Sequence, residues 1–269
     1  MAQRLLFLSH NIPFPPDSGA KIRTFNILRQ LSEVFDIAAR CVFRGRGSAG
    51  HTAENRAGIE PYAKTEVFEF PHETNLFRSG WDHLRSVATL RVYTYYMYQS
   101  ARFRASVQAL LAEGGFSLVH IDSLDLSCYL PEAVASVPTI CTHHNVESLL
   151  LERRARKATS RALGTYLSLQ SHLMEKEERE WCPRVSLNIT VSHFDAEALN
   201  QIAPGCRTAV VPNGVDTNFF VPQAAPEQGI VFCRRKFMVS QSRCTRVFRC
   251  RHPSHTSCER NTRESHLGG

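Results

Sequence analysis

The sequence contains no stretch of about 18 uncharged apolar residues, so no membrane-spanning helix is expected. The apolar run near the start, Leu5–Leu8, is too short for the core of a signal peptide, and no small-residue cleavage site follows it. No internal repeat or low-complexity segment is visible. These absences favour a globular protein that stays in the cytoplasm.

An overall excess of charge is also missing from most of the chain. Nine of the 32 basic residues but only two of the 25 acidic residues lie from Cys233 onward, which leaves 23 of each sign before it. The net charge of +7 therefore belongs to the last part of the sequence. A neutral body argues against a nucleic-acid partner, because such proteins present a basic surface.

The nine cysteines form no recognisable framework. Scattered cysteines within apolar runs of a cytosolic protein are typical of small buried side chains rather than of disulfides. This description fits the five that precede the basic end: Cys41, Cys128, Cys141, Cys182 and Cys206.

Short apolar runs alternate with amphipathic segments along the body, whose apolar content (43% for the whole chain) suffices for a packed core. Continuous apolar runs of this length are typical of strands that are buried on both faces. We expect strands at Leu5–Ser9, Ile37–Phe43, Glu66–Phe70, Leu118–Ile121, Thr139–Thr142, Leu187–Val191 and Thr208–Val211. The alternation predicts an α/β domain with a doubly wound parallel, Rossmann-like sheet.

The segments between these runs are expected to be helical, with one exception. Gly45–Gly58 is polar and glycine-rich and is expected to form a mobile loop. The expected helices are Ala20–Glu33, Asn75–Leu111, Leu124–Ala135, Glu147–Trp181 and Asp195–Gln201.

In such sheets ligands bind beyond the carboxyl ends of the strands. The loops at this edge are His10–Gly19, Ile121–Asp125, His143–Glu147, Ser192–His193 and Pro212–Asp216. Several of them carry residues that a sugar or a phosphate would need.

The first of these loops ends in Gly19, followed by Lys21 and Arg23 at the start of a helix. A glycine there lets backbone N–H groups approach a phosphate, and the helix dipole favours the anion. These three residues would suit a diphosphate. The alternative is a turn glycine beside ordinary surface bases. The three spaced glycines of a dinucleotide-binding fingerprint are not present.

The segment from His143 to Glu147 follows an expected strand and opens a helix. The paired histidines do not indicate a metal site, because sequence neighbours usually point apart and no carboxylate stands at a ligand spacing. A single histidine at a strand end, His144, is better suited to bind a sugar hydroxyl or a reacting centre. Alternatively, Asn145 caps the helix and His144 has no role.

Four segments, in this order, resemble the N-terminal half of glycosyltransferase family 4, whose members have the GT-B fold of two Rossmann-like domains. They are Pro16–Arg23, His144–Glu147, Val191–Ser192 and Val211–Asp216. The resemblance implies transfer of a sugar from a nucleotide-sugar donor to a glycan or lipid-linked acceptor, as in polysaccharide biosynthesis. It also implies retention at the anomeric carbon, with the donor phosphate as base, and no metal cofactor.

The resemblance also assigns roles to residues. Gly19 would face the donor diphosphate, and His144 would lie near the sugar or the acceptor hydroxyl. Lys21, Arg23, Asn145 and Glu147 would bind substrate. A peripheral contact with the inner face of the membrane is consistent with lipid-linked acceptors. A non-catalytic sugar- or nucleotide-binding module is the alternative, although such a module has no use for an inter-domain connector.

Three regions are expected along the chain: an acceptor-side Rossmann-like domain at 1–211, a connector with the start of a second domain at 212–232, and a tail at 233–269. The tail changes in composition at Cys233. It could be a disordered basic segment, or a zinc-binding appendage built on Cys244, Cys250, His252, His255 and Cys258, although no C-x-x-C pair supports zinc.

A change of reading frame is the third explanation of the tail and the one we favour. Codons for Met238 and Val239, read one base later, must encode tryptophan. With a permitted set of codons, the shifted frame gives Trp-Phe-Pro-Asn followed by a helix-like segment, which resembles the start of the family's second domain.

Overall fold

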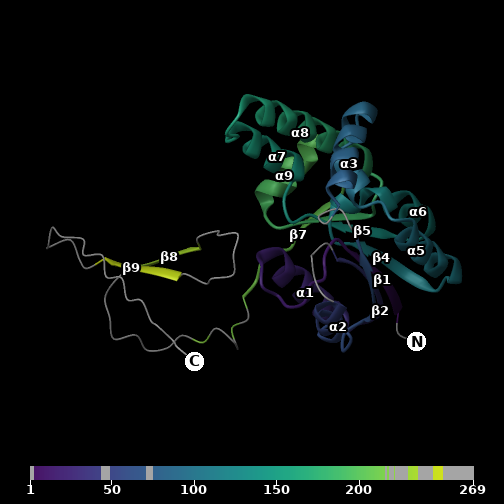
Figure 1. Cartoon of the computed structure of the whole chain (residues 1–269). Helices are drawn as coiled ribbons and strands as arrows, with labels where there is room; N and C mark the ends of the chain where they lie inside the picture. The colour runs from purple at the N-terminus through teal and green to yellow at the C-terminus, as the bar shows by residue number, and fades with distance from the viewer. Residues whose placement is uncertain are drawn as a thin grey trace. The chain divides into compact units, whose positions relative to one another are not determined.

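The computed structural model describes residues 3–43, 49–70, 75–215, 217, 221, 230–235 and 245–250. The chain divides into two compact units, Met1–Gly214 and Val215–Gly269, which we describe separately. The first unit contains a seven-stranded sheet and the helices that connect its strands (Figure 1).

The sheet of the first unit has seven parallel strands in the order β3-β2-β1-β4-β5-β6-β7. They are β1 (Gln3–Ser9), β2 (Phe35–Phe43), β3 (Lys64–Glu69), β4 (Phe116–Ile121), β5 (Thr139–Thr142), β6 (Leu187–Thr190) and β7 (Thr208–Val210). Helices lie on both faces of the sheet (Figure 1). The predicted doubly wound, Rossmann-like α/β fold is confirmed, and each of the seven expected strands is present.

The central strand β1 shows why the apolar runs are continuous. Leu5, Leu6, Phe7 and Leu8 are all fully buried. Leu6 and Leu8 belong to one apolar core, whereas Leu5 and Phe7 belong to another. Because helices cover both faces of the sheet, successive side chains of β1 enter different apolar cores. The sequence of β1 therefore does not alternate between apolar and polar residues.

The helices that connect the strands agree with the sequence in place but not always in length. They are α1 (Gly19–Leu31), α3 (Leu76–Thr89), α4 (Tyr93–Met97), α5 (Ala101–Glu113), the 3-10 helix η1 (Leu124–Tyr129), α6 (Leu130–Ser136), α7 (Glu147–Arg156), α8 (Arg161–Trp181) and α9 (His193–Ile202).

Two expected long helices are interrupted. The segment Asn75–Leu111 forms three helices, and the first of them ends at Leu90, which has a left-handed backbone with φ of 53°. The segment Glu147–Trp181 forms α7 and α8, because the hydroxyl of Ser160 accepts a hydrogen bond from the Leu163 N–H and begins a new helix.

The prediction of a loop at Gly45–Gly58 is wrong for the second part of this segment. Residues Ala49–Ala57 form the helix α2, and residues 44–48 lie outside the described residues. The polar, glycine-rich composition suggested a loop, but only Gly50 of its four glycines lies within α2, and the other residues of α2 are compatible with a helix.

In the second unit the structure describes two antiparallel strands, β8 (Ile230–Arg235) and β9 (Thr245–Cys250). β8 includes the last residues of the expected connector region and the first residues of the expected tail, and it pairs with a segment of the tail. Of the residues named in the zinc-binding alternative for the tail, Cys244, His252, His255 and Cys258 lie outside the described residues. Among the described helices, none is both long and apolar enough to cross a bilayer.

Candidate functional site

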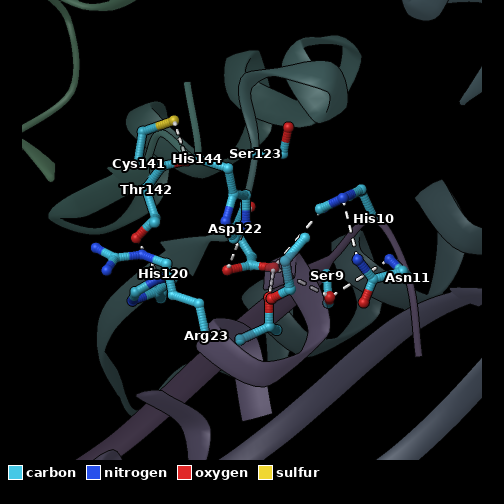
Figure 2. Close-up of polar contacts among 12 residues, drawn as sticks. Ser9, His10, Asn11, Arg23, His120, Asp122, Ser123, Cys141, Thr142 and His144 are labelled. Atoms are coloured by element: carbon cyan, nitrogen blue, oxygen red, sulfur yellow. Dashed lines mark hydrogen bonds and ion pairs between the residues drawn. The ribbon is translucent and has the colours of Figure 1, made fainter. Parts of the chain in front are cut away.

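Three neighbouring strands deliver polar side chains to one point at their carboxyl ends. His10 follows β1, Asp122 follows β4 and His144 follows β5, and these strands are adjacent in the sheet. Figure 2 shows both histidines directed toward the carboxylate of Asp122. We call these three residues the Asp122 cluster.

The carboxylate of Asp122 is fully buried and is held mainly through one oxygen. The hydroxyl of Thr24, on α1, donates to Oδ2 over 2.7 Å, and the hydroxyl of Ser9 donates to the same oxygen over 3.4 Å. The backbone N–H of Asp122 donates to the carbonyl of Leu8 over 2.9 Å. The position of Asp122 is thus fixed by the first strand and the first helix together.

His144 binds Asp122 in two ways. Its Nε2 donates to the backbone carbonyl of Asp122 over 2.9 Å and lies 3.5 Å from Oδ1 of the carboxylate. Burial alone would lower the pKa of His144, but the hydrogen bonds and the negative charge of Asp122 outweigh it and raise the pKa. The side chain is only 12% exposed, so its protonation depends on this carboxylate.

His10 lies on the other side of the carboxylate, with Nδ1 3.7 Å from Oδ2 of Asp122. The side-chain amide of Asn11 donates to Nε2 of His10 over 3.0 Å. This assignment places the imidazole proton on Nδ1, facing the carboxylate. Nε2 of His10 is therefore occupied by Asn11, and a hydroxyl could bind there only by replacing this hydrogen bond.

Asp122 remains ionised because of the groups that surround its carboxylate. Its burial would raise the pKa, but the hydrogen bond and charge of His144, the charge of His10 and the hydroxyl of Thr24 together lower it. The arrangement is a buried anion between two imidazoles, and it can orient both rings and move a proton to or from a bound hydroxyl.

The same three residues could also serve as metal ligands. One ligand atom from each of them lies within 4.8 Å of the others. However, Nε2 of His144 is already used in a hydrogen bond to a carbonyl, and the positive charge of Arg23 interacts with Asp122. A bound cation would have to displace the hydrogen bond of His144 and would be repelled by Arg23. The geometry is therefore better suited to hydrogen bonding and proton transfer than to metal binding.

His143, the neighbour of His144, points away from this cluster as the sequence suggested. It is buried, its Nε2 lies 2.9 Å from Oδ1 of Asn188, and burial lowers its pKa to about 4. It is a neutral core residue. His120 is similar, since it is buried beside Thr142 and its pKa is lowered by burial to about 4.

The remaining residues predicted on α1 have different surroundings. Gly19 is the first residue of α1, and a Cβ built on it would meet nothing within 4 Å. Lys21 pairs with Asp17 over 3.1 Å. Arg23 donates to the carbonyl of Val211 over 2.7 Å and to the side chain of Asn213 over 3.0 Å. Arg23 therefore anchors the start of the connector, and its predicted contact with phosphate stays a prediction.

Asn145 and Glu147 lie at the start of α7. Asn145 does not cap this helix, because the N-cap residue is Val146, so the capping alternative is wrong. Its amide donates to Oε1 of Glu147 over 3.4 Å. Burial and the neighbouring charge of Asp125 raise the pKa of Glu147 to about 7. A carboxylic acid with this pKa can hydrogen-bond a sugar hydroxyl as donor or acceptor.

Asp122 and His10 were not singled out in the sequence, although both lie in loops that were expected at the ligand-binding edge. A signal was available for Asp122. Asp122 is the first polar residue after a buried strand. A charged side chain at such a position is stable only when another group contacts it.

The sequence profile of Glycosyltransferase Family 4 matches residues 63–219, which is more than half of the chain. The chain belongs to glycosyltransferase family 4. No curated protein matches the sequence significantly. The matched residues of the family 4 chain include Asp122, His144 and the beginning of the connector.

Solved structures similar to the family 4 chain are glycosyltransferases. Anabaena HepE, in complex with UDP and glucose, is 16% identical to this chain with a TM-score of 0.47. The match covers 81% of this chain and 46% of the HepE chain. Sucrose-phosphate synthase from Thermosynechococcus elongatus is 12% identical with a TM-score of 0.46, covering 80% and 91%. A UDP-glucosyltransferase from Polygonum tinctorium is 12% identical with a TM-score of 0.49, covering 84% and 56%. The chain thus spans about half the length of the first of these proteins.

Proposed function

We propose that this chain is the acceptor-side half of a transferase that moves a sugar from a nucleotide-sugar donor to a glycan or lipid-linked acceptor, in cytoplasmic polysaccharide biosynthesis. The Asp122 cluster, together with membership of family 4, carries the proposal. The cluster lies at the carboxyl edge of the sheet, where parallel α/β folds bind their ligands.

Within this proposal the cluster binds hydroxyl groups. His144 and His10, oriented by Asp122, contact a hydroxyl of the transferred sugar or of the acceptor. Gly19 and the first turn of α1 approach the donor diphosphate, supported by Lys21, while Asn145 and Glu147 bind the sugar. Retention is the stereochemical outcome implied by the family resemblance, with the donor phosphate as base. We expect no metal cofactor, so a chelator should leave turnover unchanged.

A second domain completes the site in this proposal, because transfer requires the diphosphate to be enclosed and the anomeric carbon to be positioned. The test compares the 269-residue chain with a frame-corrected protein, in which the shifted frame after Phe232 is translated.

The frame-corrected protein is expected to transfer sugar from one member of a panel of nucleotide sugars, whereas the present chain gives little product. Product release is followed by detection of free nucleoside diphosphate and by mass spectrometry of the acceptor. Equal turnover by both proteins would contradict the two-domain proposal. Donor binding without turnover by the frame-corrected protein would favour a non-catalytic binding module instead.

Gly19→Ala separates a phosphate-binding glycine from an ordinary turn glycine. The new methyl group meets nothing within 4 Å, so the melting temperature should not fall. If a phosphate contacts this backbone, the methyl group blocks its approach, and the Kd for the donor should rise about tenfold, or about 1.4 kcal/mol. Calorimetric titration of the frame-corrected protein measures this. An unchanged Kd would assign Gly19 to the turn alone.

A further inference from the structure

The helix α7, which begins at Glu147 shortly after His144, has no capping side chain of its own. The first N–H groups of a helix lack partners within it, and a polar side chain at the N-cap position usually binds one of them. Such residues begin the helices α3, α5, α8 and α9: Asn75, Ser100, Ser160 and Ser192. The N-cap residue of α7 is instead Val146, which is fully buried and cannot accept a hydrogen bond.

A carboxyl group from another helix takes the place of this cap. Glu178, on α8, is fully buried, and its Oε1 accepts a hydrogen bond from the backbone N–H of Ser148 over 3.2 Å. The hydroxyl of Ser148 donates to Oε2 of the same side chain over 2.5 Å. The first turn of α7 is thus capped by a residue 30 positions further along the chain.

The helix α8 binds every polar group of Ser148. Besides the two contacts with Glu178, the hydroxyl of Ser171 donates to the carbonyl of Ser148 over 2.9 Å. Ser148 itself is buried, and α7 and α8 pack against each other (Figure 1). A buried polar network whose members are all hydrogen-bonded is rigid, so these contacts fix the first turn of α7 relative to α8.

Glu178 also acts on Glu147 through its charge. Burial raises the pKa of Glu178 to about 7, although the hydrogen bonds from Ser148 and from the backbone of Glu147 oppose this change. After burial and the charge of Asp125, the charge of Glu178 is a further cause that raises the pKa of Glu147. The contacts of Glu178 therefore bear on both the backbone and the carboxyl group of Glu147.

The segment that joins β5 to α7 is held at both of its ends. At its start, His143 is buried and hydrogen-bonded to β6. At its end, Ser148 is bound by Glu178. His144 and Glu147 lie between these two anchors, so the anchors determine where their side chains point.

We propose that Glu178 is a positioning residue for the segment His144–Glu147, which it holds in place by capping α7 from α8. Glu178 does not touch substrate, because its side chain is fully buried. The inference rests on the proposed function only for the ligand of this segment, a sugar.

Amide hydrogen exchange in the 269-residue chain tests the cap without an activity assay. Glu178→Met nearly keeps the size of the side chain but cannot accept a hydrogen bond, so exchange of the Ser148 N–H should accelerate about tenfold or more. Glu178→Gln retains an acceptor oxygen and should keep most of the protection. The first turn of α9, capped by Ser192, should exchange as in the wild type in both variants.

Glu177→Met is the matched control. Glu177 is the preceding residue of α8 and is also buried, but it pairs with Arg91 rather than with α7. Its loss should lower the melting temperature and leave exchange of the Ser148 N–H unchanged. If Glu178→Met does not fold, Ser148→Ala removes one of the two donors to Glu178 and should accelerate exchange at the same position to a smaller extent.

Turnover by the frame-corrected protein tests the consequence for the site. Glu178→Met should lower kcat/KM about tenfold, mainly through a higher KM for the donor, because a displaced Glu147 binds the sugar less tightly. Glu178→Gln should recover most of this loss. Glu177→Met should leave kcat and KM unchanged.

Three results would overturn the proposal. The first is wild-type exchange of the Ser148 N–H in Glu178→Met. The second is an equal acceleration in Glu177→Met, which would mean that loss of any buried carboxylate of α8 loosens α7. The third is faster exchange in Glu178→Met with unchanged kcat/KM. An inactive frame-corrected protein would contradict the proposed function instead, and the exchange rates would still decide whether Glu178 holds this segment.

Discussion

Replacing Asp122 by alanine is expected to lower the free energy of unfolding by about 3 kcal/mol. The carboxylate is fully buried, and its loss leaves the hydroxyls of Thr24 and Ser9 without their acceptor and His144 without its counter-charge. Urea denaturation measures the change. As a control, Asp36→Ala removes a half-exposed carboxylate paired with Lys64 and should cost no more than about 0.5 kcal/mol.

The pH dependence of stability gives the same substitution a second readout. The pKa of Asp122 is lowered in the folded state, so its contribution is present at neutral pH and is lost as the pH falls below its ordinary value of 3.8. The pKa of His144 is raised, so its contribution is complete below 6.5 and is lost as the pH rises through the folded value. Asp122→Asn should weaken both dependences. Unchanged pH profiles would mean that the cluster is not electrostatically coupled.

His144→Ala is expected to lower kcat/KM for sugar transfer by the frame-corrected protein about 100-fold. His144 is the member of the Asp122 cluster that follows β5. We propose that its imidazole binds a hydroxyl of the sugar or of the acceptor during transfer. Stability should fall by only about 1 kcal/mol, the value of one hydrogen bond to the Asp122 carbonyl. His172→Ala, on the exposed side of α8, is the matched control.

A loss confined to KM would indicate that His144 binds substrate without a larger role in the transition state. His144→Gln can still donate a hydrogen bond and should recover part of the activity if positioning is the main contribution. If His144→Ala transfers sugar as the wild type does, the cluster has a structural role only.

The sheet could be predicted because burial on both faces leaves a clear mark in the sequence. β1 reads as an unbroken apolar run since Leu6 and Leu5 enter different cores. The breaks in the helices left no such mark. The turn at Leu90 depends on a left-handed residue that is not glycine, and the start of α8 at Ser160 depends on one hydroxyl among several polar neighbours.

The site could be predicted only in part for a related reason. His144 follows a strand and belongs to a segment that resembles the family, so its place at this edge of the sheet was visible in the sequence. The importance of Asp122 comes from contacts across 98 and 22 positions, with Thr24 and His144, which no local pattern contains. Likewise, the role of Arg23 as an anchor for Val211 appears only once α1 and the residues that follow β7 are folded together.

The most direct test of the account is the rate of sugar transfer by Asp122→Asn in the frame-corrected protein. Asparagine keeps the size of the side chain and can still accept the hydrogen bond from Thr24, but it removes the charge between His10 and His144. We expect kcat/KM to fall about 100-fold or more, with a circular dichroism spectrum like that of the wild type. Wild-type kcat/KM in this folded variant would contradict the assignment of the Asp122 cluster as the site of transfer.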